Sequence, residues 1–87
     1  MDLGLKDRIA LVAAGSKGLG FGVARALARE GARVSLCSRD PNSVDNAVRQ
    51  LQNETGAEVM GVACDVRKRA DIEHWVQQSV ERWGRIV

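Results

Sequence analysis

The chain has 87 residues, of which 45% are hydrophobic and 28% charged, and its formal net charge is +2. This length predicts one domain or part of one, and so small a charge without a basic run argues against nucleic-acid binding. No apolar stretch approaches the roughly 18 residues that a membrane span needs, and residues 1–7 do not resemble a signal peptide.

The first half of the chain alternates apolar runs with a helical pattern. Residues 9–13 form a short apolar run that predicts a strand buried on both faces. The helix after the following glycines repeats its apolar residues every four positions beside a small-residue face, and Gly31 ends it. These helix residues are Leu19, Val23 and Leu27, with Ala24 and Ala28 beside them. Residues 34–37 predict a second buried strand.

The second half repeats this alternation. Asp40 and Pro41 are typical of an N-cap and the first helical position, and Gly56 ends the helix that they begin. That helix has one apolar stripe, formed by Val44, Ala47, Val48 and Leu51. Residues 59–64 predict a third strand. The apolar face of a third helix, which Gly84 ends, consists of Ile72, Val76, Val80 and Trp83. Trp75 and Trp83 are eight residues apart, and we expect both to pack against the sheet or a neighbouring segment.

Strands that alternate with helices predict an α/β fold with parallel strands and right-handed crossovers. We expect residues 1–87 to be the N-terminal βαβαβα portion of a single Rossmann-type, doubly wound dinucleotide-binding domain, with a fourth strand opening at residues 86–87. In the strand order 3-2-1-4, absence of the fourth strand leaves the first one as a bare apolar edge. The isolated 87-residue chain is therefore expected to be unstable or self-associated.

The loop between the first strand and helix, residues 13–20, reads Ala-Ala-Gly-Ser-Lys-Gly-Leu-Gly. A helix N-terminus presents unpaired N–H groups and the positive end of its dipole, and glycines let a phosphate approach them. Neither the G-x-G-x-x-G fingerprint nor the Walker pattern occurs, and a turn that binds no ligand is the alternative. The place of this loop, after the first strand and before an Ala-rich helix, favours a phosphate site.

This loop resembles the Thr-Gly-x-x-x-Gly-x-Gly loop of the short-chain dehydrogenase/reductase family. Asp65-Val66 and residues 83–86, Trp-Gly-Arg-Ile, are similar to further landmarks of that family. The resemblance covers the whole chain but only the front part of a typical member, and the layout is similar to the 3-oxoacyl-carrier-protein reductase branch. Ala13 and Ala14 replace the family's Thr-Gly pair, and Val87 stands where many members carry Asp.

The resemblance implies that the loop holds the phosphates of a dinucleotide, and that Asp65 and the backbone of Val66 meet the adenine. An Asp65 that accepts N–H groups of its own loop is the alternative, and the two roles are compatible. The expected cofactor-binding residues are Gly15, Ser16, Lys17, Gly18, Leu19, Gly20, Ser38, Arg39, Asp65 and Val66.

The end of the second strand predicts which dinucleotide binds. Sites for NAD usually carry an acid here that holds the ribose 2′-hydroxyl, whereas Ser38 is neutral and Arg39 suits a 2′-phosphate. Lys17 could add a second cation, and solvated surface cations are the alternative for both residues. Asp40 could bind the ribose diol, but its place before Pro41 favours a helix cap. We therefore expect NADP rather than NAD.

The family's reaction uses a tyrosine, a lysine four residues later and a nearby serine, and this chain contains no tyrosine. We expect no catalytic residue in it, a solvent-facing His74, no metal site, and reduced, buried Cys37 and Cys64 in a cytoplasmic protein. The resemblance implies that the intact protein is a homo-oligomeric enzyme, and the residues after the second strand predict that it depends on NADP. It would reduce a carbonyl or oxidise an alcohol by hydride transfer. A non-catalytic module that binds a nucleotide or a partner chain is the alternative, and a passive fragment without a ligand is a third hypothesis.

Overall fold

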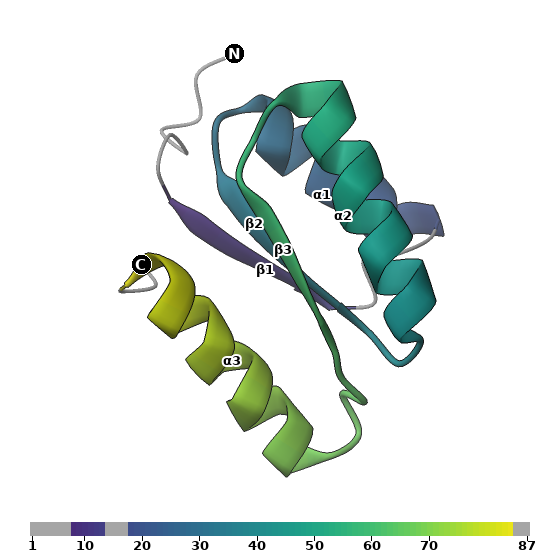
Figure 1. The fold of residues 1–87 in the computed structure, drawn as a ribbon, viewed down its shortest axis with the longest axis vertical. Helices are drawn as coiled ribbons and strands as arrows, with labels where there is room; N and C mark the ends of the chain where they lie inside the picture. The colour runs from purple at the N-terminus through teal and green to yellow at the C-terminus, as the bar shows by residue number, and fades with distance from the viewer. Residues whose placement is uncertain (1–7, 14–17, 85–87) are drawn as a thin grey trace.

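The computed structural model describes residues 8–13 and 18–84, and within them parallel strands form one sheet in the order β1-β2-β3 (Figure 1). The elements in chain order are β1 (Ile9–Ala13), α1 (Gly18–Arg29), β2 (Arg33–Ser38), α2 (Pro41–Thr55), β3 (Val59–Ala63) and α3 (Arg69–Trp83). Helices α1 and α2 lie on one face of the sheet and α3 on the other (Figure 1). This arrangement confirms the predicted α/β fold of the doubly wound, Rossmann type.

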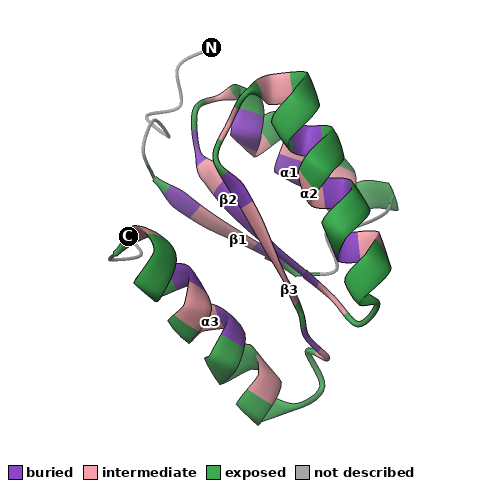
Figure 2. Ribbon diagram, viewed as in Figure 1, coloured by how far each residue is buried: buried purple, intermediate pink, exposed green. Residues whose placement is uncertain are grey.

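The larger core lies between the sheet and helices α1 and α2 (Figure 2). Successive side chains of a strand point to opposite faces, and Val34 and Leu36 of β2 are the fully buried residues that point to this one. The core consists of Val12, Ala24, Ala28, Ala32, Val34, Leu36, Ala47, Leu51 and Val59. Because the contribution of α1 is alanine, its backbone can lie close to the sheet.

The buried face of α1 differs from the predicted apolar repeat. Ala24 and Ala28 are buried, whereas Leu19 is 85% exposed and Val23 45% exposed. Only Leu27 of the repeat packs against the core, together with Phe21. The four-residue repeat therefore does not mark the core face. The small-residue face that the sequence also predicted is the buried one, because close packing on the sheet selects the small side chains.

The predicted apolar face of α3 is also wrong. Trp75 and Ser79 are the buried residues of this helix, while Ile72 and Val80 are 37% and 39% exposed. Burial of one indole removes roughly 150–250 Å² from water, which is more than either aliphatic side chain offers. The prediction that Trp75 packs against the sheet is confirmed, and His74 is exposed as expected.

A closed hydrogen-bond ring joins α3 to β2 beneath the indole. Trp75 Nε1 donates to Ser35 Oγ at 2.8 Å, the two serine hydroxyls lie 2.7 Å apart, and Ser79 Oγ donates to the Trp75 carbonyl at 2.9 Å. Because the Ser79 proton is committed to that carbonyl, Ser35 must donate to Ser79. Each donor of the three side chains then has an acceptor, so these buried polar groups cost little.

Both cysteines lie on this same face of the sheet. Cys37 and Cys64 are free thiols, 0% and 3% exposed, and they cluster with Trp75. Burial raises the pKa of the Cys64 thiol to about 11, and the neighbouring Cys37 adds to that rise. The Cys64 thiol is therefore protonated and unreactive at neutral pH.

Helix α2 begins and ends as predicted. Asp40 is the N-cap and accepts from the Asn42 N–H at 2.9 Å, Pro41 is the first helical residue, and Gly56 ends the helix at φ 69° with its N–H on the Gln52 carbonyl. These signals depend only on residues a few positions apart, which is why the sequence alone locates this helix.

Gly61 sets the distance between α2 and β3. A Cβ atom at this position would overlap Val44 Cγ1 and lie 2.8 Å from Val48 Cγ2. Glycine in a strand often marks such a close approach of two backbones. Helix α2 is therefore packed closely against the middle of β3.

Candidate functional site

The predicted site residues follow the carboxyl ends of the strands, which lie together at one end of the sheet, called here its carboxyl edge. Ala13 of β1 pairs with Cys37 of β2, Ser38 pairs with Ala63 of β3, and the Cys64 N–H donates to the Ser38 carbonyl at 2.8 Å. The carboxyl ends of the three parallel strands consequently lie side by side (Figure 1). Ligands of open α/β sheets bind at this carboxyl edge.

The N-terminus of α1 lies at this edge and is open to solvent. Gly18, Leu19 and Gly20 form the first turn of α1, while Gly15, Ser16 and Lys17 lie outside the described residues. Gly18 has φ 57°, a left-handed conformation that favours glycine, and among the described residues a Cβ built on it would meet nothing within 4 Å. No acidic residue lies in the first turn. The positive end of the helix dipole is therefore not offset by an acid in that turn.

The turn after β2 separates an engaged acid from an exposed cation. Asp40 Oδ1 accepts from the Asn42 N–H at 2.9 Å, and Oδ2 accepts from Ser43 Oγ at 3.0 Å. The Asp40 N–H in turn points to Ser38 Oγ at 3.4 Å. Both carboxylate oxygens of Asp40 thus serve the start of α2, as predicted for a cap, while the neighbouring Arg39 is exposed.

Asp65, just after β3, holds an arginine that the sequence analysis did not single out. Its Oδ1 accepts from the backbone N–H and from Nε of Arg67, and its Oδ2 accepts from Nη2, each at 3.0 Å. These bonds and the Arg67 charge, together with Arg39, hold the pKa of Asp65 well below its usual range. Asp65 is therefore ionised at neutral pH, and it makes the loop N–H contact that was one of its two expected roles.

The signal for this pair is present in the sequence, since Asp65 and Arg67 are two residues apart in a loop. An aspartate commonly bonds the backbone N–H two residues later, which brings the side chain of that residue alongside. Val66, between them, is 44% exposed. Arg39, Asp65 and Val66 thus border the same edge of the sheet as the first turn of α1.

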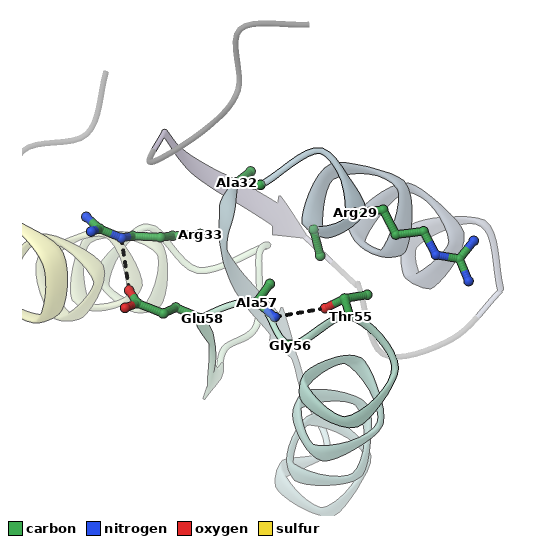
Figure 3. A pocket seen from close by; sticks show the side chains of 9 residues that line it. Arg29, Ala32, Arg33, Thr55, Gly56, Ala57 and Glu58 are labelled. Carbon is green, nitrogen blue, oxygen red and sulfur yellow. Dashed lines mark hydrogen bonds and ion pairs between the residues drawn. The ribbon is translucent and has the colours of Figure 1, made fainter. Parts of the chain in front are cut away.

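A hollow of about 330 Å³ lies at the opposite edge, where the strands begin (Figure 3). Its lining combines the C-terminal ends of α1 and α2 with the starts of β2 and β3: Ala28, Arg29, Gly31, Ala32, Arg33, Thr55, Gly56, Ala57 and Glu58. Polar groups of the lining bond one another, since Arg33 Nε lies 2.9 Å from Glu58 Oε2 and the Ala57 N–H donates to Thr55 Oγ1 at 3.1 Å (Figure 3). This hollow is remote from the predicted site residues.

Two other kinds of site receive no support from the described part of the chain. Within residues 8–13 and 18–84, no group of three or more His, Cys, Asp or Glu side chains is placed to hold a metal ion. Over the same residues, no helix has both the length and the apolar character needed to cross a bilayer.

A protein-family model covers nearly the whole chain. The model of the short chain dehydrogenase family matches residues 8–87. A human relative, dehydrogenase/reductase SDR family member 2, mitochondrial, is 42% identical over 82 residues, which are 94% of this chain and 29% of the relative. The chain therefore spans less than a third of the length of that relative.

Solved structures share the fold and differ in their bound dinucleotide. L-sorbose reductase from Gluconobacter frateurii, complexed with NADPH and L-sorbose, superposes with a TM-score of 0.92 at 30% identity, over 97% of this chain and 32% of that enzyme. A short chain dehydrogenase/reductase from Burkholderia phymatum in complex with NAD superposes with a TM-score of 0.89 at 26% identity, over 94% of this chain and 29% of that protein.

Proposed function

The chain belongs to the short-chain dehydrogenase family, and from this we propose that residues 1–87 are the N-terminal part of the dinucleotide-binding domain of an NADP-dependent oxidoreductase. The full-length protein reduces a carbonyl or oxidises an alcohol of a small-molecule substrate. NADP, when bound, carries the hydride that this reaction transfers. The catalytic tyrosine that the resemblance requires, and with it the lysine four residues later, belong to the rest of that protein, because this chain holds no tyrosine.

The described residues fit such a cofactor. The open amides at the first turn of α1, around Gly18, Leu19 and Gly20, hold the pyrophosphate, with Gly15, Ser16 and Lys17 completing the loop. The Asp65 carboxylate and the Val66 backbone receive the adenine at the end of β3. The open space beside Gly18 supports the first assignment, because a phosphate oxygen needs to approach where a Cβ would otherwise stand.

The choice of NADP over NAD rests on the turn after β2. An NAD site usually carries an acid at the end of the second strand that binds the ribose, whereas both oxygens of Asp40 bond the start of α2 and so orient this carboxylate toward the helix. Ser38 is neutral, and Arg39 offers a planar guanidinium suited to a phosphate. The observation that carries this proposal is that Asp40 caps α2 while Arg39, the residue before it, is exposed. The solved structures that share this fold include one with NADPH and one with NAD, so the fold alone does not select the cofactor. The side chains after β2 therefore determine the preference.

The broader assignments extend the same proposal. We place the protein in the cytoplasm, where reduced thiols such as the buried Cys37 and Cys64 persist, and we expect a homo-oligomer that binds neither nucleic acid nor membrane. The human relative carries the word mitochondrial in its name, so imaging of the tagged full-length protein tests the compartment. The layout of the 3-oxoacyl-carrier-protein reductase branch stays a prediction, since the segments that select the substrate are not in this chain.

The test is the change from Arg39 to Ala in the full-length protein, with NADPH and NADH affinities measured by fluorescence titration. Removal of one charge-assisted contact is expected to lower the ratio of NADPH to NADH affinity about tenfold. Arg49→Ala, which removes an exposed arginine from the middle of α2, is the matched control and leaves the ratio unchanged. A wild-type protein that binds neither nucleotide would refute the proposal, and an unchanged ratio in Arg39→Ala would refute the preference for NADP.

A further inference from the structure

The turns after β2 and β3 place two arginines and one aspartate beside each other. Ser38 and Ala63 are paired at the strand ends, and the Cys64 N–H bonds the Ser38 carbonyl at 2.8 Å. Arg39 follows the first of these strand ends, and Asp65 with Arg67 follows the second. Arg39 also contributes to the lowered pKa of Asp65, as expected if the two charges lie close together.

Asp65 fixes the position of the Arg67 guanidinium. The side chain of Asp65 is only 14% exposed, whereas that of Arg67 is 73% exposed. Three bonds of 3.0 Å join them, and the Asp65 N–H is itself held by Asp71 Oδ2 at 2.9 Å. A partly buried carboxylate therefore holds an arginine whose other face looks into solvent.

The pairing leaves bonding capacity on both partners. Arg67 uses Nε and Nη2, so both hydrogens of Nη1 and the second hydrogen of Nη2 take no part in it. Asp65 Oδ2 accepts one bond in the pair, whereas a carboxylate oxygen can accept about two. Arg67 can thus donate to an anion at this edge while Asp65 accepts a donor from the same ligand.

Charge gives Arg67 a second effect. Without Arg67, the positive charge of Arg39 and the negative charge of Asp65 would cancel, and the Asp65 carboxylate would repel a phosphate group bound next to it. Arg67 neutralises Asp65, so the group of three residues keeps one positive charge in excess. A ribose 2′-phosphate carries about two negative charges, whereas a ribose hydroxyl carries none, so this excess favours the phosphorylated nucleotide.

We infer that Arg67 is a specificity-determining residue, which together with Arg39 forms a two-arginine cradle for the 2′-phosphate of the dinucleotide. This inference rests on the proposed function, since it names a further residue of the same site. The cradle joins the ends of two neighbouring strands, so it discriminates between nucleotides without a residue of the loop before α1.

The test uses the full-length protein and two probes that differ only in the 2′-phosphate, adenosine 2′,5′-bisphosphate and adenosine 5′-monophosphate. Calorimetric titration gives the ratio of their affinities. Arg67→Ala is expected to lower the preference for the bisphosphate about fivefold to tenfold, because one exposed charge-assisted contact is lost. Arg67→Lys, which keeps the charge without the forked geometry, retains an intermediate preference.

Arg69→Ala is the matched control, since Arg69 is an exposed cation that begins α3 two residues further on. It is expected to leave the preference within about twofold of the wild type. If Arg67→Ala keeps the wild-type preference for the bisphosphate over the monophosphate, the inference is overturned and the proposed function still stands. Equal effects of Arg67→Ala and Arg69→Ala also overturn it, because they indicate a general loss of positive charge. A wild-type protein that binds no NADPH refutes the proposed function itself.

Discussion

Arg39 and Asp40 are neighbours in the sequence with opposite roles in the structure. The Asp40 carboxylate bonds the Asn42 N–H and the Ser43 hydroxyl, so it serves the helix that it begins. Arg39 lies outside that local network and is exposed. At the scale of single residues, the choice between NAD and NADP therefore depends on which of two adjacent charges is already engaged.

Replacement of Asp40 by Ala tests this division directly. Loss of the cap is expected to lower the free energy of unfolding by about 1 kcal/mol, within a range of about 0.5–2 kcal/mol. The ratio of NADPH to NADH affinity is expected to stay within about twofold, because Asp40 does not bind the ribose. Urea unfolding and nucleotide titration measure the two quantities. A large rise in that ratio, caused by lost NADH binding, would show that Asp40 serves the ribose instead.

Helices α1 and α3 attach to the sheet by different means. Helix α1 buries Ala24 and Ala28, so its contribution depends on close approach of the backbones. Helix α3 buries one large indole and closes a hydrogen-bond ring through Ser35 and Ser79. The attachment of α3 thus depends on a few side chains, and a single substitution among them should lower the free energy of unfolding markedly.

Ser79→Ala in the full-length protein removes the acceptor of the Ser35 hydroxyl and leaves a buried polar group unpaired. The expected cost is about 1–3 kcal/mol of unfolding free energy. Ser43→Ala, at a half-buried serine in the first turn of α2, is the comparison and costs less. The blue shift of the Trp75 emission is also expected to change, because the indole N–H loses an oriented partner. Equal stability of Ser79→Ala and the wild type would show that the ring contributes nothing to docking.

At the scale of the molecule, the described part of the chain leaves both β1 and β3 at the edges of the sheet. Across β3, Gln52 Nε2 donates to the Val59 carbonyl at 3.2 Å, which covers one backbone group near that edge. Strand β1 carries Ile-Ala-Leu-Val-Ala, with neither charge nor proline to discourage pairing with another chain. A polypeptide of this length also buries only about 60–65% of its unfolded surface.

An isolated polypeptide of residues 1–87 is therefore expected to self-associate or to melt without cooperativity. Light scattering coupled to size-exclusion chromatography should give a mass that rises with protein concentration, because pairing at the open edge of β1 follows mass action. The full-length protein is the control and is expected to melt cooperatively. A monomer of constant mass with a sharp thermal transition would contradict the prediction and show that the β1 edge is harmless.

The order of elements could be read from the sequence because its signals are local. Apolar runs, the Asp40-Pro41 start of α2 and the Gly56 end of α2 each involve residues within a few positions of one another. The resulting α/β fold and the 3-2-1 part of its strand order are confirmed, while the fourth strand expected at residues 86–87 lies outside the described residues. The roles of Gly18, Ser38 and Arg39 toward a cofactor stay predictions, and those of Gly15, Ser16 and Lys17 fall outside the described residues.

Tertiary structure alone decided which helix faces are buried and which distant side chains meet. The sequences of α1 and α3 each have more than one face that could pack on a sheet. The alanines of α1 and the indole of α3 are the groups that are buried, because they fit the space that strands distant in sequence leave for them. Cys37 and Cys64 become neighbours, as do Ser35 and Ser79, only through the pairing of β2 with β3 and the crossover to α3. Packing against partners remote in sequence sets these contacts, and no local pattern contains that information.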